Sequence, residues 1–157
     1  MSGAIGLDTN VLVRYFVAPG DDVAERQQCD QARTLIDAGQ PLKICKTVLL
    51  ELEWVLRGYY RYARSDIGRV LAWLVEQPHI TLEDRSAVGR ALANYDAGFD
   101  FADALHHASY GDCQQVASFD DRGFARREPA DARQALGRDG AQFVGHVHHV
   151  RGDFAAQ

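Results

Sequence analysis

The sequence predicts a single α/β domain in which short parallel strands form a central sheet, covered by helices in three α/β/α layers. Short apolar segments alternate with longer amphipathic segments along the 157 residues, a pattern typical of parallel sheets with helical crossovers. Glycine and proline separate many of these segments. The apolar share of 46% and the charged share of 25% are those of a soluble globular chain. We therefore expect one domain over residues 1–157.

The first part of the chain predicts a strand, two helices and a second strand. Residues 4–7 are a short apolar run, which indicates a buried strand, and the apolar residues of 11–16 recur with helical spacing. A second helix is expected between the break at 19–22 and Ala38, which precedes a glycine suited to ending a helix. Residues 41–45 predict the next strand. The inward-facing side chains of the second helix are expected to be Cys29, Ala32, Leu35 and Ile36.

The middle of the chain predicts three helices with a strand before the last of them. Thr47 suits the cap of a helix, and Glu51 falls inside the apolar stripe of that helix. Ser65 begins the second helix, residues 79–82 predict a short strand, and Asp84 begins the third helix. The apolar stripe that contains Glu51 consists of Val48, Leu52, Val55, Leu56 and Tyr59.

The last part of the chain predicts one helix and two strands. Residues 101–110 are rich in alanine and predict the helix, and residues 115–119 predict a strand that runs into Asp120. We expect this strand to belong to the same parallel sheet as the strand at 4–7. Residues 143–150 predict a final strand, whose histidines we interpret as solvated residues rather than metal ligands.

Composition and charge exclude several classes of protein. The net charge of −5 disfavours a broad basic surface, so any nucleic-acid contact must be local, with cations masking the carboxylates. The cysteines are odd in number and widely spaced, which argues against disulfides and zinc and suggests core residues in a reducing compartment. We recognise neither a signal sequence nor a run of about 20 apolar residues, and we expect a cytoplasmic protein without a membrane span. The cysteines are Cys29, Cys45 and Cys113.

Several acidic residues stand where this fold would bring them together. Asp8 and Asp120 each follow a predicted strand, and ligands bind at the carboxyl ends of parallel strands. Glu51 lies in an apolar stripe, where an unpaired carboxylate is unfavourable, and Asp100 and Asp103 are spaced to share one helix face. Oxygen-rich sites suit Mg²⁺ and Mn²⁺. Such ions activate water and stabilise a phosphodiester under attack.

Each of these acids also has an ordinary structural interpretation. Glu51 by itself would more often pair with an arginine, such as Arg57 or Arg14. Asp100 suits a helix cap, and the aspartates at 120–121 suit a turn after a strand. The four acids taken together favour a metal site over these separate interpretations.

Four motifs support a comparison with a known family. They are LDTNVLVRY at 7–15, VLLELEWVL at 48–56, DFADALHHA at 100–108 and SFD at 118–120. In this order they resemble the signature of the PIN-domain nucleases, most closely that of the VapC toxins of type II toxin–antitoxin pairs. The resemblance extends over residues 5–127, and segment 128–157 fits the family pattern poorly.

The resemblance implies an endoribonuclease that hydrolyses RNA phosphodiesters with Mg²⁺ or Mn²⁺. It also implies a homodimer and a small cognate antitoxin as partner. The metal-binding and catalytic acids would be Asp8, Glu51, Asp103 and Asp120, with Asp100 and Asp121 as further candidate ligands. The candidates for supporting or binding the substrate are Asn10, Ser118 and Arg14. The family usually has threonine where this chain has Ser118.

Rival functions fit the sequence less well. Aspartate-dependent phosphatases need a second aspartate two residues after the first, and Asn10 occupies that position. Receiver domains need a lysine after a strand, and Lys43 and Lys46 are the only lysines. The more serious alternative is a PIN-like module that binds RNA or a protein without cleaving it. The presence of all four acids argues against this alternative.

Overall fold

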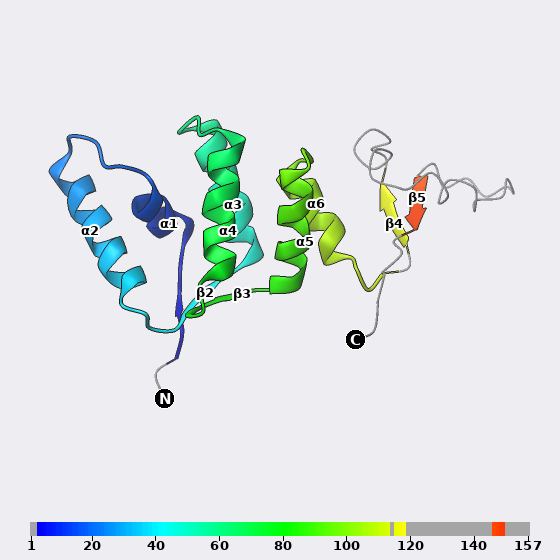
Figure 1. Ribbon diagram of the computed structural model, residues 1–157, viewed down its shortest axis with the longest axis horizontal. Helices are drawn as coiled ribbons and strands as arrows, with labels where there is room; N and C mark the ends of the chain where they lie inside the picture. The colour runs from blue at the N-terminus through cyan, green and yellow to red at the C-terminus, as the bar shows by residue number, and fades with distance from the viewer. Residues whose placement is uncertain (1–2, 114, 119–145, 150–157) are drawn as a thin grey trace, which may run out of the picture. The chain divides into compact units, whose positions relative to one another are not determined.

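The computed structural model describes residues 3–113, 115–118 and 146–149. The chain divides into two compact units, one reaching to Leu105 and the other beginning at His106. The first unit contains the predicted strands and helices in the predicted order (Figure 1). The single domain expected over residues 1–157 stays a prediction.

Each strand of the first unit is followed by two helices. In chain order the elements are β1 (Ile5–Gly6), α1 (Thr9–Phe16), α2 (Val23–Asp37), β2 (Leu42–Ile44), α3 (Lys46–Gly58), α4 (Arg64–Glu76), β3 (Ile80–Leu82), α5 (Arg85–Asp96) and α6 (Phe101–Ser109). The last of these helices continues into the second unit. Within the described ranges, no helix has both the length and the apolar character needed to cross a membrane.

The strands of the first unit form a parallel sheet in the order β1-β2-β3. Ile5 pairs with Leu42, and Leu42 pairs in turn with Ile80. The N–H of Leu7 donates to the carbonyl of Lys43 at 2.9 Å, which extends the pairing beyond β1. Helical crossovers are the usual connection between parallel strands. The predicted α/β class with a central parallel sheet of short strands is confirmed, and the arrangement is consistent with three α/β/α layers.

Aspartate side chains cap α1, α2 and α5 in the first unit. Asp22 and Asp84 accept hydrogen bonds of 2.8 and 3.1 Å from N–H groups in the first turns of α2 and α5, and Asp8 caps α1. Such a carboxylate satisfies an N–H group that has no intrahelical partner and interacts favourably with the helix dipole. The helix start predicted at Asp84 is confirmed. Thr47, however, lies inside α3, because Cys45 is the N-cap residue.

The core of the first unit is formed by the sheet and the apolar faces of the helices. On β2 and β3 the first and last residues are buried and the middle residue is exposed. This alternation places successive side chains on opposite faces of the sheet. The helices contribute fully buried side chains that include Leu12, Ile36, Leu49, Leu52, Leu56, Ile67, Leu71, Leu74 and Tyr95.

Two predictions about burial are wrong. The strand β1, which lies at one edge of the three-stranded sheet, is exposed, with Ile5 at 42% exposure. Cys45 and Cys113 are also exposed, which leaves Cys29 as the one buried cysteine. All three cysteines are free, in agreement with the prediction that they form no disulfide.

The second unit contains a two-stranded antiparallel sheet. It consists of β4 (Gln115–Ser118) and β5 (His146–His149), with Ser118 opposite His146. Both strands fall inside segments that the sequence predicts to be strands. The backbone pairing described for β4 is with β5, and the expectation that β4 belongs to the parallel sheet stays a prediction.

Candidate active site

The end of β1 places Asp8 at the start of α1. Leu7 is buried, and the chain then turns so that the carboxylate of Asp8 is exposed and caps the helix. Its Oδ1 atom accepts a hydrogen bond of 2.9 Å from the N–H of Thr9. Asp8 therefore has the position expected from the sequence, between a strand of the parallel sheet and the following helix.

Thr9 connects this turn to Glu51 on α3. The side chain of Thr9 is 5% exposed, and its hydroxyl donates a hydrogen bond of 2.9 Å to Oε2 of Glu51. Its backbone N–H is the group that contacts Asp8. One threonine thus holds both carboxylates, and the sequence prediction that Asp8 and Glu51 come together agrees with this geometry.

A pocket of about 280 Å³ opens beside the two carboxylates. Its walls come from α1, from α3 and from the connection that follows α3. It is lined by Asp8, Thr9, Asn10, Val13, Arg14, Glu51, Val55 and Tyr60. The pocket therefore combines two acids, an amide, a guanidinium group and an aromatic ring.

Arg14 is held in position by two residues of α2. Its Nη1 atom lies 2.6 Å from Oε1 of Glu25, and its Nε donates to Oε1 of Gln28 at 2.9 Å. The other oxygen of Glu25 accepts a hydrogen bond of 3.3 Å from the N–H of Gly20. Arg14 and Asn10 also line a second pocket, of about 470 Å³, between α1 and α2. The arginine suggested as a partner for Glu51 is thus paired with Glu25.

Glu53, and not Glu51, is the buried acid of α3. The exposed fraction of Glu53 is 5%, whereas Glu51 is exposed. The prediction that Glu51 lies in the buried stripe is wrong, because α3 buries a different face from the one predicted. Its buried residues are Leu49, Leu52, Glu53 and Leu56.

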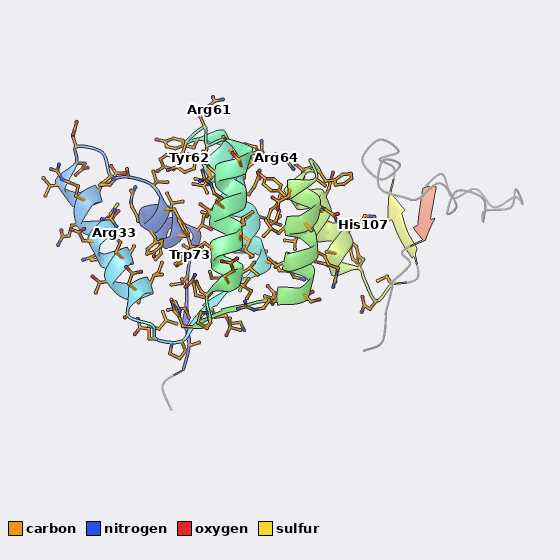
Figure 2. All side chains as sticks on the ribbon, viewed as in Figure 1. Arg33, Arg61, Tyr62, Arg64, Trp73 and His107 are labelled. Atoms are coloured by element: carbon orange, nitrogen blue, oxygen red, sulfur yellow. The ribbon has the colours of Figure 1, made fainter. Side chains whose placement is uncertain are left out.

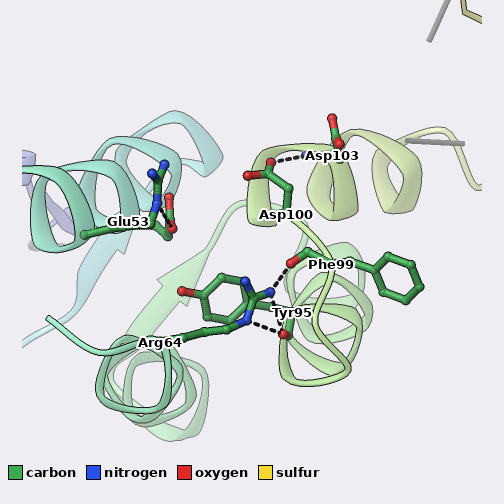
Figure 3. A network of polar contacts seen from close by, with 7 residues as sticks. Glu53, Arg64, Tyr95, Phe99, Asp100 and Asp103 are labelled. Carbon is green, nitrogen blue, oxygen red and sulfur yellow. Dashed lines mark hydrogen bonds and ion pairs between the residues drawn. The ribbon is translucent and has the colours of Figure 1, made fainter. Parts of the chain in front are cut away.

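Glu53 joins a network that connects three helices (Figure 3). Its Oε1 accepts a hydrogen bond of 2.8 Å from Nε of Arg57, one turn further along α3. This hydrogen bond and the charge of Glu53 raise the pKa of Arg57. Burial raises the pKa of the Tyr95 phenol, and the charge of Glu53 and a hydrogen bond to it act in the same direction.

The side chain of Arg64 fixes the end of α5 by donating hydrogen bonds to backbone carbonyl groups there. Figure 3 shows this side chain reaching from the start of α4 to Tyr95. Its Nε and Nη2 atoms donate to the carbonyl of Tyr95 at 3.0 and 2.7 Å, and Nη2 also donates to the carbonyl of Phe99. The guanidinium carbon lies 3.9 Å from the centre of the Tyr95 ring, a cation–π contact. These contacts assign Arg64 a structural role.

Asp100 and Asp103 lie at the start of α6. Oδ1 of Asp100 accepts a hydrogen bond of 3.1 Å from the N–H of Asp103 (Figure 3), so Asp100 has the capping geometry considered from the sequence. Asp103 is half-buried. In the part of the chain that the structure describes, no three histidine, cysteine or acidic side chains are grouped as a metal site. Asp8 and Glu51 are brought together, and the role of Asp103 as a further ligand stays a prediction.

Three further candidates have no described side chain. Ser118 is the last residue of β4, and only its backbone is described. Asp120 and Asp121 lie outside the described residues. Their predicted roles as ligands or as substrate contacts therefore stay predictions.

One residue of the site was missed from the sequence. Thr9 bridges the two carboxylates, and its hydroxyl next to Asp8 was the available signal. Tyr60, which the sequence offers as a residue that stacks on a base or fills the core, lines the pocket. It lies beyond the end of α3, where helical spacing no longer predicts which way a side chain points.

The fold and the pocket define an α/β domain with an acidic site at the carboxyl end of its parallel sheet. The oxygen atoms of the pocket are hard ligands, which suit Mg²⁺ and Mn²⁺ better than softer metals. Arg14 adds a group that recognises phosphate well. These features are those expected of an enzyme that acts on phosphodiesters.

The chain belongs to the PIN domain family, because the model of that family matches residues 5–128. This range agrees with the resemblance that the four motifs indicated. PIN domains are generally nucleases and typically use divalent metal ions. No curated protein and no solved structure matches the chain significantly.

Proposed function

We propose that this protein is an Mg²⁺- or Mn²⁺-dependent endoribonuclease whose active site is the pocket beside Asp8 and Glu51. The observation that carries the proposal is the pairing of these carboxylates through Thr9 at one pocket. Membership of the PIN domain family supports a nuclease. The resemblance of the motifs to VapC toxins supports RNA as the substrate.

The residues of the pocket fit a divalent cation. Mg²⁺ commonly binds through one or two carboxylates and keeps several water molecules, and Asp8 and Glu51 supply two carboxylates. Thr9 engages Oδ1 of Asp8 and Oε2 of Glu51, so Oδ2 and Oε1 are the atoms these contacts leave for ligands. When bound, the cation would activate water and stabilise the charge on the phosphodiester. Asp103 and Asp120 are the other proposed ligands.

The side chains around the pocket have separate proposed roles. A carboxylate orients the attacking water and accepts its proton. Thr9 fixes the carboxylate of Glu51, and Arg14 contacts phosphate oxygens from the wall of the pocket. The contacts of Arg14 with Glu25 and Gln28 hold its guanidinium in place before the substrate arrives. This reduces the conformational entropy lost on binding.

The test is cleavage of a mixed RNA pool by the full chain during titration with Mg²⁺ and Mn²⁺. Asp8→Asn and Glu51→Gln suit this test because asparagine can still cap α1 and glutamine can still accept from Thr9. We expect each variant to lose more than about 100-fold in rate at saturating RNA. Asp30→Asn is the matched control, since this carboxylate is 77% exposed and lies elsewhere, on α2.

Two outcomes would contradict the proposal. The first is undiminished metal-dependent cleavage by both Asp8→Asn and Glu51→Gln, with their folding intact by circular dichroism. The second is an absence of cleavage by the wild type at any metal concentration. Retained RNA or protein binding in that second case would favour the non-catalytic PIN-like module instead.

We further propose that the ribonuclease is the toxin of a type II toxin–antitoxin pair in the cytoplasm, acting as a homodimer. The resemblance of the four motifs to VapC toxins supports this part of the proposal. Induced expression should arrest bacterial growth, and Asp8→Asn should abolish the arrest. Co-expression of the small protein encoded beside the gene should restore growth. Light scattering should give the mass of a dimer, and a monomer would contradict the dimeric state.

A further inference from the structure

Three tyrosines form a cluster where α3 joins α4. The rings of Tyr59 and Tyr60 meet edge to face with centroids 4.8 Å apart, and those of Tyr60 and Tyr62 are 6.5 Å apart. Tyr59 is 77% exposed, so its ring contributes little to the core. We call Tyr59, Tyr60 and Tyr62 the tyrosine cluster.

Backbone hydrogen bonds fix the tyrosine cluster to the end of α3. The N–H groups of Tyr59 and Tyr60 both donate to the carbonyl of Val55, at 2.9 and 3.2 Å, and the N–H of Tyr62 donates to Leu56 at 2.9 Å. Arg61 adopts a left-handed conformation with φ of 58°, which non-glycine residues adopt infrequently. Figure 2 shows Arg61 and Tyr62 on this connection. The rings are therefore presented by a tethered segment rather than by a free loop.

The tyrosine cluster is continuous with the acidic pocket. Tyr60 lines that pocket together with Asp8 and Glu51, and Tyr59 extends the aromatic surface outward from Tyr60. A strand of nucleic acid whose phosphate lies at the two carboxylates would therefore have its neighbouring base within reach of the cluster.

The charge of the protein explains why aromatic contacts matter here. Nucleic-acid affinity commonly comes from basic groups that neutralise phosphates, but this chain has a net charge of −5. Its pocket contains two carboxylates, and its arginine is paired with Glu25. Stacking of a base on an aromatic ring is largely independent of net charge and tolerates any base. A stacking surface thus supplies affinity that this electrostatic environment does not.

We propose that the tyrosine cluster is a stacking platform for an unpaired RNA base adjacent to the scissile phosphate. This inference rests on the proposed ribonuclease function. Tyr60 stacks on the base closest to the pocket, and Tyr59 supports the Tyr60 ring and extends the platform. Because an unpaired base is required, single-stranded RNA is bound in preference to duplex RNA.

The test uses a short fluorescein-labelled single-stranded RNA that carries one cleavage site mapped from the RNA pool. Steady-state cleavage is measured for the wild type, Tyr60→Leu, Tyr60→Phe and Tyr59→Ala. We expect Tyr60→Leu to raise KM about tenfold and Tyr59→Ala to raise it severalfold, both with kcat nearly unchanged. Tyr60→Phe should keep the wild-type KM. Trp54→Ala is the matched control, because Trp54 is an exposed aromatic residue of α3 that does not line the pocket.

An RNA with an abasic nucleotide next to the cleavage site separates stacking from other effects. The wild type should cut this RNA about tenfold less efficiently than the intact RNA, whereas Tyr60→Leu should cut both equally. An equal abasic effect in the wild type and in Tyr60→Leu would overturn the platform. The platform would also be overturned if Tyr59→Ala and Tyr60→Leu each showed the wild-type KM.

A binding measurement distinguishes this inference from the proposed ribonuclease function. Fluorescence anisotropy is recorded in the presence of Ca²⁺ with a short fluorescein-labelled single-stranded RNA of mixed sequence, which needs no mapped cleavage site. If the wild type cuts no RNA but binds it, and Tyr60→Leu weakens binding about tenfold, the platform stands and the nuclease proposal fails. If the wild type neither cuts nor binds RNA, both fail.

Discussion

The hydroxyl of Thr9 donates a hydrogen bond to Oε2 of Glu51, 2.9 Å away and 42 positions further along the chain. The contact joins the first turn of α1 to α3. Because the backbone N–H of the same threonine binds Asp8, the separation of the two carboxylates depends on a single buried residue. Outer groups of this kind orient the ligands of metal sites.

Thr9→Val removes this hydroxyl with little change in shape. We expect the rate of RNA cleavage to fall about tenfold and the metal concentration at half-maximal rate to rise. Thr9→Ser keeps the hydroxyl and should retain most of the activity. The free energy of unfolding should fall by only about 1 kcal/mol, since Glu51 is exposed and water replaces the lost donor. Equal metal dependence in Thr9→Val and the wild type would refute the bridging role.

Glu53→Ala should destabilise the fold, in contrast to Glu51→Ala. Glu53 is 5% exposed and accepts from Arg57 at 2.8 Å, and its removal also leaves the buried Tyr95 phenol without its carboxylate partner. We expect a loss of about 1–3 kcal/mol in urea unfolding. Glu51→Ala should change the free energy of unfolding by no more than about 0.5 kcal/mol. Similar unfolding midpoints for both variants would show that the buried network contributes little.

Tyr15 should make stability depend on pH in the alkaline range. Burial, together with a hydrogen bond of 2.8 Å to Asp37 and the charge of that carboxylate, raises the pKa of Tyr15 from 10.0 to about 12. The folded protein thus favours the neutral phenol. The resulting stabilisation is complete below pH 10.0 and is lost as the pH rises through about 12. Chemical unfolding at several pH values should show this loss in the wild type but not in Tyr15→Phe.

Arg64→Lys should weaken the junction of α4 and α5. A lysine keeps the charge but not the planar group that reaches the carbonyls of Tyr95 and Phe99 together and covers the Tyr95 ring. We expect a loss of about 1–2 kcal/mol and faster hydrogen exchange at the end of α5. Arg69→Lys on the same helix is the control, because Arg69 is 81% exposed. An unfolding midpoint for Arg64→Lys equal to that of the control would contradict this prediction.

The elements of the first unit could be predicted because their local signals agree. Apolar spacing identified the helices, and capping residues such as Asp84 identified where α5 begins. The pairing of β4 could not be predicted in this way. A strand pattern at Gln115–Ser118 is compatible with a parallel or an antiparallel neighbour, and β5 supplies that neighbour from a distant segment.

The sequence predicted that Asp8 and Glu51 come together, but not the threonine that connects them. The sequence did not predict the buried face of α3 correctly. This helix carries leucines on several sides, so the pattern does not define its inner face uniquely. Contacts such as that of Thr9 depend on how α1 packs against α3, and this is a property of the tertiary structure.

The contacts of Glu25 couple the loop before α2 to the candidate site. One oxygen of Glu25 holds Arg14, and the other holds the backbone of Gly20. A change in the length or shape of this loop would move Glu25 and free the guanidinium group of Arg14, which lines the pocket beside Asp8 and Glu51. Variation in this loop would then alter the electrostatic environment of the pocket without substituting any residue that lines it.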